Sequence, residues 1–132
     1  MAGHARFTAV LDACVLYPVS VADASMSLAV IDLYAAKWTT RIEVEWIRNL
    51  EAARPELAGR LDVRRDTMRQ AVPDWEIPES AWRPLISALE LPDAGAVHVL
   101  AAAIAGHADC ILTANLKDFP AEILSGHAMT AR

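Results

Sequence analysis

The chain has 132 residues, of which 55% are apolar, with a formal net charge of -5 and a mean hydropathy of +0.24. This length and composition fit one domain, residues 1–132, with a well-filled core. The acidic balance argues against a broad nucleic-acid cradle, which usually shows as an excess of basic residues.

Two further classes of protein are disfavoured. Cys14 and Cys110 lie in apolar runs without paired spacing, which gives no support to a disulfide framework or a zinc site and favours a reducing cytosol. The longest apolar run, residues 96–105, is broken by His98 and is far too short to span a bilayer. No basic N-terminal region precedes a long apolar segment, so we expect a soluble cytoplasmic protein that is neither exported nor membrane-bound.

The chain opens with a predicted strand and a predicted helix. Residues 7–11 are apolar and partly β-branched, which indicates a buried strand with Asp12 at its C-terminal tip. Ser20 or Asp23 can cap a helix that continues to about residue 37. Its larger apolar positions recur at helical spacing, at Met26, Val30, Leu33 and Tyr34.

Two more helices are expected next. Thr39 or Thr40 can cap the first, whose buried face carries Ile42, Trp46 and Leu50. Its polar residues point largely elsewhere, namely Glu43, Glu45, Arg48 and Asn49. Pro55 is well placed to start a helix through about residue 71, whose arginines we interpret as a solvated face: Arg60, Arg64, Arg65 and Arg69.

The second half predicts short strands between helices. A brief strand at residues 75–78 precedes a helical stretch around 81–89. An apolar helix at 96–105 leads to a strand at 110–113, and residues 127–131 form a final edge strand. This alternation predicts an α/β fold with a mostly parallel central sheet flanked by helices.

Polar side chains follow two of these strands. In a parallel sheet the carboxyl ends of the strands meet at one edge, so Asp12 is expected near Thr113, Asn115 and Asp118, with Glu45 facing the same cleft. Carboxylates gathered at one point repel unless a hard cation such as Mg²⁺ or Mn²⁺ lies between them. Such a site suits phosphodiester hydrolysis, in which Thr113 orients a carboxylate or a water and Asn115 bonds to a metal ligand.

These residues resemble a known family, the PIN-domain ribonucleases, in particular the toxin subunits of VapBC-type toxin–antitoxin pairs. The resemblance rests on LDACVLYP with Asp12, on EWIRNL with Glu45 and on HVLAAAIAGHADCILTANLKDFP with Asp118, and it covers nearly the whole chain. It implies a PIN-like three-layer sandwich and cleavage of RNA by about four acidic residues with Mg²⁺ or Mn²⁺. It also implies a small antitoxin as a partner and a homodimer.

By the resemblance, Asp12 matches the first acid of the family, Glu45 the second and Asp118 the last. The third acid belongs at the start of the apolar helix, in a pattern like D-R-H-V-L-A-A-A. This chain has Ala96 and Val97 there, so both the acid and the basic residue after it are absent. The gap leaves two functions open: a weakened metal-dependent endoribonuclease, or an inactive PIN-like module that binds an antitoxin or RNA.

Other features depart from the family pattern or have an ordinary alternative. Cys14 stands where Ser or Asn is common, and related sequences often continue beyond the equivalent of Arg132, which indicates a shortened C-terminus. A natural loss and a deliberate change that permits expression of a toxic protein both explain the gap at Ala96. Asp93 is expected to cap the following helix, and in the alternative it leans towards the site and partly replaces the missing acid.

The remaining candidates are weighed against structural roles. Glu43 is an alternative to Glu45, and His98 is expected to be a core or edge histidine rather than a ligand. Arg48 and Lys117 are weak candidates for contacts to RNA phosphate. We expect core or interface roles for the tryptophans at 38, 46, 75 and 82, and a place at the opposite edge of the sheet for Asp109.

Overall fold

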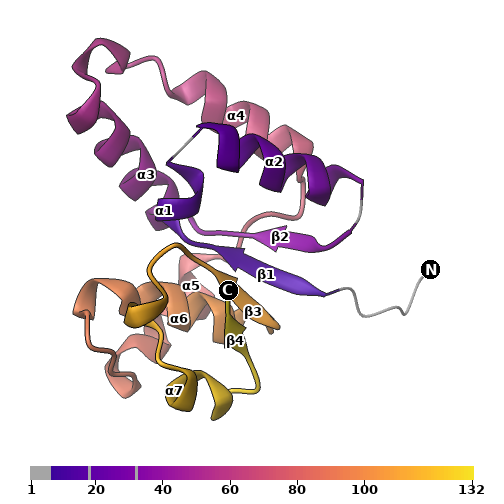
Figure 1. Ribbon diagram of the computed structural model, residues 1–132, viewed down its shortest axis with the longest axis vertical. Coiled ribbons are helices and arrows are strands. Elements are labelled where there is room, and N and C mark those ends of the chain that lie inside the picture. Colours follow the sequence, from indigo (N-terminus) through magenta and orange to yellow (C-terminus); the bar gives the residue numbers. More distant parts are fainter. Residues whose placement is uncertain (1–6, 18, 32) are drawn as a thin grey trace.

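The protein forms an α/β fold around a four-stranded sheet, shown in Figure 1 as a computed structural model that describes residues 7–17, 19–31 and 33–132. The strands are β1 (Thr8–Leu11), β2 (Ala35–Lys37), β3 (Cys110–Leu112) and β4 (Thr130–Ala131). They lie in the order β2-β1-β3-β4, and every pairing is parallel. Because the chain leaves β1 for one neighbour and later returns to the other, the strand order reverses at the carboxyl ends of β1 and β3.

The helices form two groups around the sheet (Figure 1). The first group holds α1 (Ala13–Leu16), α2 (Val19–Val30), α3 (Thr40–Ala53) and α4 (Asp62–Ala71), with contacts between α1 and α3 and between α2 and α4. The second holds α5 (Glu79–Trp82), α6 (Val97–Ala105) and α7 (Ala121–Ser125), with α5 packed on α6. Short 3-10 turns link them, at Pro55–Leu57, Arg83–Ala88, Ala94–Ala96 and Leu116–Asp118.

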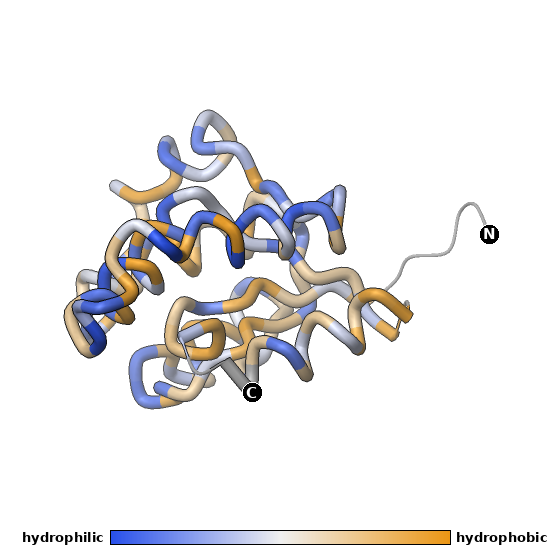
Figure 2. The backbone as a smooth tube through the Cα atoms, turned by 90° about the horizontal axis from the view of Figure 1, so that it is seen from above, coloured by the Kyte–Doolittle hydropathy of each residue, from blue (hydrophilic) through white to orange (hydrophobic). Residues whose placement is uncertain are grey.

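The core is made of strand residues, the inner face of α6 and large aromatic side chains. Val10, Leu11 and Ile111 are fully buried, as are Trp38 and Trp46. Along the helices hydrophobic and hydrophilic residues alternate, as expected where one face of each helix is covered (Figure 2). The expected core role of all four tryptophans is confirmed.

Several predictions from the sequence are confirmed. β1 ends directly before Asp12, and Thr39 caps α3 by accepting a hydrogen bond from the backbone N–H of Ile42 at 3.0 Å. β3 lies within residues 110–113, and β4 is an edge strand within 127–131.

The helix predicted to reach residue 37 was wrong in both its start and its end. α2 begins at Val19, before both predicted caps, and ends at Val30, which is 56% exposed. Residues 35–37 are instead β2, whose Ala35 and Ala36 lie opposite Thr8 and Ala9 of β1. The apolar spacing was misleading because pairing with a distant strand outweighs the weak helix preference of this segment.

The other element boundaries differ more mildly. The helix predicted from Pro55 to residue 71 is interrupted, because Gly59 adopts a φ of +79° and α4 starts only at Asp62. Residues 75–78 contribute one parallel bridge, between Trp38 and Glu76, rather than a strand. The helical stretch around 81–89 begins at residue 79 and tightens to a 3-10 turn, and α7 was not predicted.

No helix in the described part of the chain has the length and apolar character needed to cross a membrane.

Cys14 is half-buried and Cys110 is buried, and both are free thiols. The absence of a disulfide between them agrees with the sequence.

Candidate functional site

The site is centred on Asp12, at the point where the strand order reverses. The backbone N–H of Asp12 donates to the carbonyl of Leu112 at 3.0 Å, which fixes the end of β1 beside the end of β3. The hydroxyl of Thr113 then donates to Oδ2 of Asp12 at 2.9 Å, across 101 positions of sequence. Thr113 in turn accepts a hydrogen bond from the backbone N–H of Asn115 at 3.0 Å. The predicted meeting of these two strand ends is therefore observed.

Asp12 also begins α1. Its Oδ1 accepts a hydrogen bond from the backbone N–H of Ala13 at 2.8 Å, which is the geometry of a helix cap. A role as a helix cap and a role in the site are compatible for Asp12, because the cap uses Oδ1 and the contact with Thr113 uses Oδ2.

Cys14 joins the same network. Its thiol lies 3.4 Å from Oδ2 of Asp12 and 3.4 Å from the hydroxyl of Thr113, and the backbone N–H of Ala114 donates to its sulfur at 3.2 Å. Burial raises the pKa of the Cys14 thiol above its usual range, so the group is a neutral donor at physiological pH. The sequence marked this position only as a departure from a family pattern, and its contacts were not predicted.

Glu45 forms a second pair, with His98. Nε2 of His98 lies 2.9 Å from Oε2 of Glu45, joining α6 to α3 and hence one helix group to the other. The histidine is 1% exposed, whereas the Glu45 side chain is 32% exposed. His98 is buried, as expected, but its contact with the predicted site carboxylate was missed. The available signal was its place as the only polar side chain at the start of an otherwise apolar helix.

Glu43 is ruled out as the alternative to Glu45 for a site carboxylate, because its side chain is buried and bonded to core residues. The expectation that it points away from the buried face was wrong, since its side chain is 3% exposed. Trp38 donates its indole N–H to Oε2 at 3.0 Å, and Arg69 binds both carboxylate oxygens through Nε and Nη2. The guanidinium of Arg69 also lies 4.7 Å from the centre of the Trp75 ring.

The arginines of α4 are likewise not a purely solvated face, which corrects a second prediction. Arg64 is half-buried, donates to the backbone carbonyl of Leu16 and lies 4.8 Å from the Trp46 ring centre. The prediction failed because two of the three arginines of α4, Arg64 and Arg69, lie over the aromatic rings of Trp46 and Trp75.

Among the described residues, no hydrogen bond joins the side chains of Asp118 and Asp93 to these two pairs. Asp118 is half-buried at the end of a 3-10 turn, where its backbone N–H donates to the carbonyl of Asn115 at 3.0 Å. Asp93 is exposed and caps the next turn, accepting from the N–H of Gly95 at 2.9 Å, as predicted. Ala96 is 8% exposed at the start of α6. Within the described residues, no three His, Cys, Asp or Glu side chains are arranged as a ready metal site.

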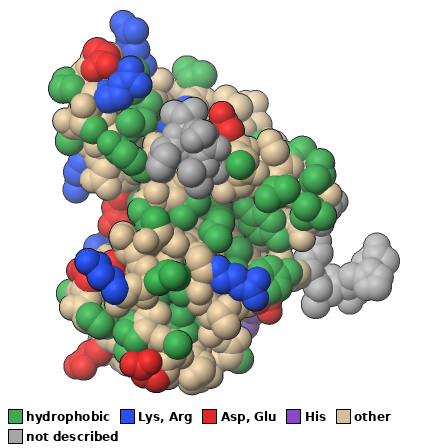
Figure 3. Space-filling model, in the orientation of Figure 1, with side chains coloured by type: hydrophobic (Ala, Val, Ile, Leu, Met, Phe, Trp, Pro, Cys, Tyr) green, Lys and Arg blue, Asp and Glu red, His purple; other side chains and the backbone are tan. Residues whose placement is uncertain are grey.

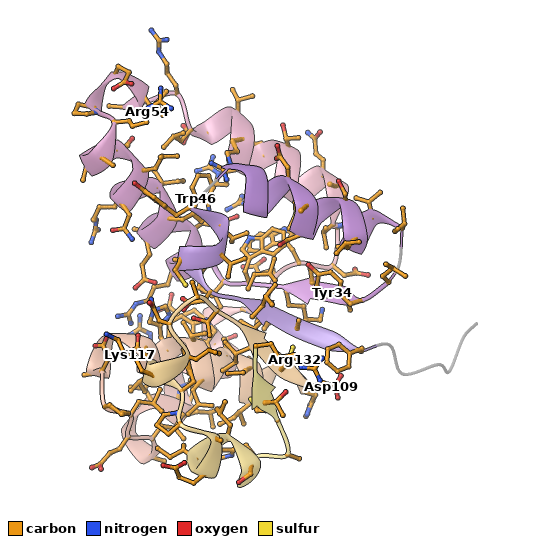
Figure 4. The ribbon with its side chains drawn as sticks, in the orientation of Figure 1. Tyr34, Trp46, Arg54, Asp109, Lys117 and Arg132 are labelled. Atoms are coloured by element: carbon orange, nitrogen blue, oxygen red, sulfur yellow. The ribbon has the colours of Figure 1, made fainter. Side chains whose placement is uncertain are left out.

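The surroundings of the site are visible in the figures. The outline of the molecule is indented where the two helix groups meet (Figure 3), and Lys117 lies on that side (Figure 4). Lys117 and Arg48 are both exposed. Asp109 lies towards the opposite side and accepts from the N–H of Thr8 at 2.7 Å, which agrees with its predicted place.

The carboxylate oxygens of this region are the kind of ligand that a hard divalent cation prefers. A carboxylate offers about four acceptor positions, and three of those on Asp12 are used by Ala13, Cys14 and Thr113. Mg²⁺ needs only one or two protein carboxylates, because it keeps several waters and takes the rest of its ligands from a phosphate. The carboxylates of Asp12 and Glu45 are therefore ligands of the type that Mg²⁺ accepts.

Comparisons of this chain with protein-family models, with curated proteins and with solved structures give no match. Functional inference therefore rests on the residues and their geometry.

Proposed function

We propose that this chain is a PIN-like three-layer α/β protein that acts as a metal-dependent endoribonuclease of toxin type, with activity weakened at Ala96. The observation that carries the proposal is the Asp12–Thr113 pair at the reversal of strand order, where open parallel sheets bind ligands. The pairing of Glu45 with His98 on neighbouring elements adds a second oriented carboxylate.

Each residue has a distinct part in the proposed reaction. Mg²⁺ or Mn²⁺, when bound, supplies charge neutralisation on the phosphate and activation of water. Asp12 holds the cation, and Thr113 fixes the orientation of that carboxylate. Glu45, about a third exposed, contributes an open carboxylate oxygen, while exposed Lys117 and Arg48 contact RNA phosphates. His98 cannot itself exchange protons with a substrate, because its ring is 1% exposed.

The test is cleavage of RNA by the full chain in Mg²⁺ or Mn²⁺, with Asp12→Asn as the matched inactive control. We expect weak cleavage that Asp12→Asn abolishes and that chelation removes. The variant Ala96→Asp restores a carboxylate at a helix start, where an acidic side chain is favoured, and it should raise both Mn²⁺ affinity and the cleavage rate. Equal cleavage by the wild type and Asp12→Asn would refute the enzymatic proposal, and an Ala96→Asp variant with unchanged affinity and rate would remove position 96 from the site.

A second function, binding of a helical antitoxin, is favoured by a groove between α2 and α4. The groove has a volume of about 660 Å³. Its lining is mostly apolar, with Ala22, Asp23, Met26, Ser27, Val30, Ile31, Arg64, Thr67, Met68 and Ala71. Arg64 is the one cation among the lining residues, so an amphipathic helix whose apolar face is flanked by a carboxylate suits this surface. This function requires no metal and would persist in an inactive protein.

The groove is tested with a synthetic amphipathic helix that carries one Glu, followed by fluorescence anisotropy. Val30→Asp, in the groove, should weaken binding at least tenfold, because a charge then faces apolar surface. Leu28→Asp is the matched control, since Leu28 is 45% exposed on the same helix but does not line the groove. Equal effects of the two substitutions, or no binding to the wild type, would contradict the proposal.

A further inference from the structure

The contact between His98 and Glu45 has features that packing alone does not explain. His98 belongs to the first half of α6, whose residues from Val97 to Ala103 are all buried. An imidazole in such surroundings is costly unless its polar atoms are bonded, and an apolar side chain would fill the same space at lower cost. Only Nε2 is bonded, to Glu45, whereas Nδ1 is buried and has no partner in the described residues.

The neighbouring aromatic ring, Trp82, does not supply a hydrogen bond to Nδ1 of His98 either. The ring of Trp82 lies 6.1 Å from that of His98 at an angle of 50°, and the indole N–H of Trp82 is likewise buried with no hydrogen-bond partner among the described residues. Within that part of the chain, the hydrogen bond to Glu45 is thus the only hydrogen bond of this imidazole. A side chain that tolerates an unpaired nitrogen in order to make one bond is best explained by what that bond does to its partner.

The hydrogen bond restrains only one of the two carboxylate oxygens of Glu45. Oε2 receives the hydrogen bond, while Oε1 accepts none from the described residues. A surface glutamate otherwise samples many rotamers, and ordering it upon cation binding costs conformational entropy. With Oε2 bonded to a buried ring, part of that ordering is already present in the free protein, and the side chain is still 32% exposed.

We propose that His98 is a positioning residue that holds the Glu45 carboxylate so that its free oxygen can bind a divalent cation or a water on that cation. The inference rests on the proposed metal-dependent function and adds a residue to its site. Hydrogen-bond partners of metal ligands change metal affinity by about 10–100-fold when they are removed. The role matters more in this chain because Ala96 supplies no carboxylate, which leaves few others to share the ion.

The test measures Mn²⁺ binding to the full chain by calorimetry, in four variants at position 98 or beside it. His98→Leu should weaken binding roughly tenfold or more. His98→Gln places an amide N–H close to where Nε2 lies and should restore most of the affinity, whereas His98→Asn places its amide near Nδ1 and should not. Trp82→Phe, which changes the neighbouring ring but leaves the hydrogen bond intact, should bind as the wild type does.

If His98 had only a structural role, its replacement would change stability but not Mn²⁺ affinity. The positioning role predicts the reverse. His98→Leu removes the unpaired Nδ1, so its urea midpoint should match or exceed that of the wild type, whereas its Mn²⁺ affinity should fall. Adding His98→Leu to Glu45→Gln should cause little further loss of Mn²⁺ affinity, because His98 acts only through the Glu45 carboxylate. Wild-type affinity in His98→Leu, or equal affinities in the Gln and Asn variants, would overturn the inference while leaving the proposed function intact. A wild type that binds no Mn²⁺ would overturn the proposed function, and the positioning role with it.

Discussion

Replacing Glu43 by Gln should destabilise the fold without affecting the site. The carboxylate accepts two hydrogen bonds from Arg69 and one, at 3.0 Å, from the indole of Trp38. Removing one partner of a buried ion pair costs about 3–5 kcal/mol. Because the side chain of Arg69 is 35% exposed, water recovers part of this loss, and we expect about 2–3 kcal/mol for Glu43→Gln. Glu43→Ala should cost about 1–3 kcal/mol more, since the buried Trp38 N–H then has no acceptor.

The measurement is urea unfolding followed by tryptophan fluorescence, which reports directly on the stacked rings of Trp38 and Trp75, 5.4 Å apart. With a typical slope for a small domain, the midpoint of Glu43→Gln should fall by roughly 1 to 2 M. Glu45→Gln is the matched control on the same helix, and it should stay within about 1 kcal/mol of the wild type while losing Mn²⁺ affinity. A Glu43→Gln variant within about 0.5 kcal/mol of the wild type would show that the ion pair contributes little net stability, contrary to this reasoning.

Three further outcomes can be measured. Thr113→Val should lower Mn²⁺ affinity roughly tenfold by calorimetry, because Asp12 loses the hydroxyl that donates to its Oδ2 at 2.9 Å. Unchanged affinity would show that Thr113 does not contribute to the site. Burial raises the pKa values of Cys14 and Cys110 above 9.0 and that of Tyr34 to about 12. Above about pH 9 the folded protein therefore keeps protons that the unfolded chain has lost. The free energy of unfolding should be constant just below about pH 9 and should decrease as the pH rises further. A free energy of unfolding that stays constant up to about pH 11 would contradict this. Gly59→Ala should cost about 1 kcal/mol in urea unfolding through its φ of +79° alone, since no atom lies within 4 Å of the added methyl group.

The parts of the fold that could be predicted are those with a local cause. The strand before Asp12 has an apolar, β-branched sequence, and Thr39 caps α3 by reaching only three residues along the chain. β2 could not be predicted in this way, because the sequence Ala-Ala-Lys at 35–37 has no strand preference of its own. It is a strand because β1 lies beside it and supplies the backbone partners.

The acidic residues also divide into those placed by local sequence and those placed by distant partners. Glu43 and Glu45 are two positions apart on one helix, and nothing in their local sequence separates a core residue from a site residue. Glu43 is buried because Arg69, 26 positions later, reaches both of its oxygens. Glu45 is oriented because His98, 53 positions later, enters from another helix. Position at a strand end was therefore enough to predict that Asp12 lies beside Thr113, whereas distant partners decide how each acidic residue of α3 is placed.

The number of carboxylates is a poor guide to whether this site is active, because the two oriented ones come from separate parts of the fold. Asp12 is held by Thr113 beside the sheet, and Glu45 is held by His98 between the helix groups. Mg²⁺ with several retained waters can be shared by two such groups without a preformed cluster, so the decisive question is whether both carboxylates act on one ion. If they do, Asp12→Asn and Glu45→Gln must be coupled in their effects on Mn²⁺ affinity, since the second substitution removes a ligand from an ion that is already lost. Independent effects of the two substitutions on Mn²⁺ affinity would mean that Asp12 and Glu45 each contact a cation weakly and separately. That result would favour the second function, a binding module, over the nuclease.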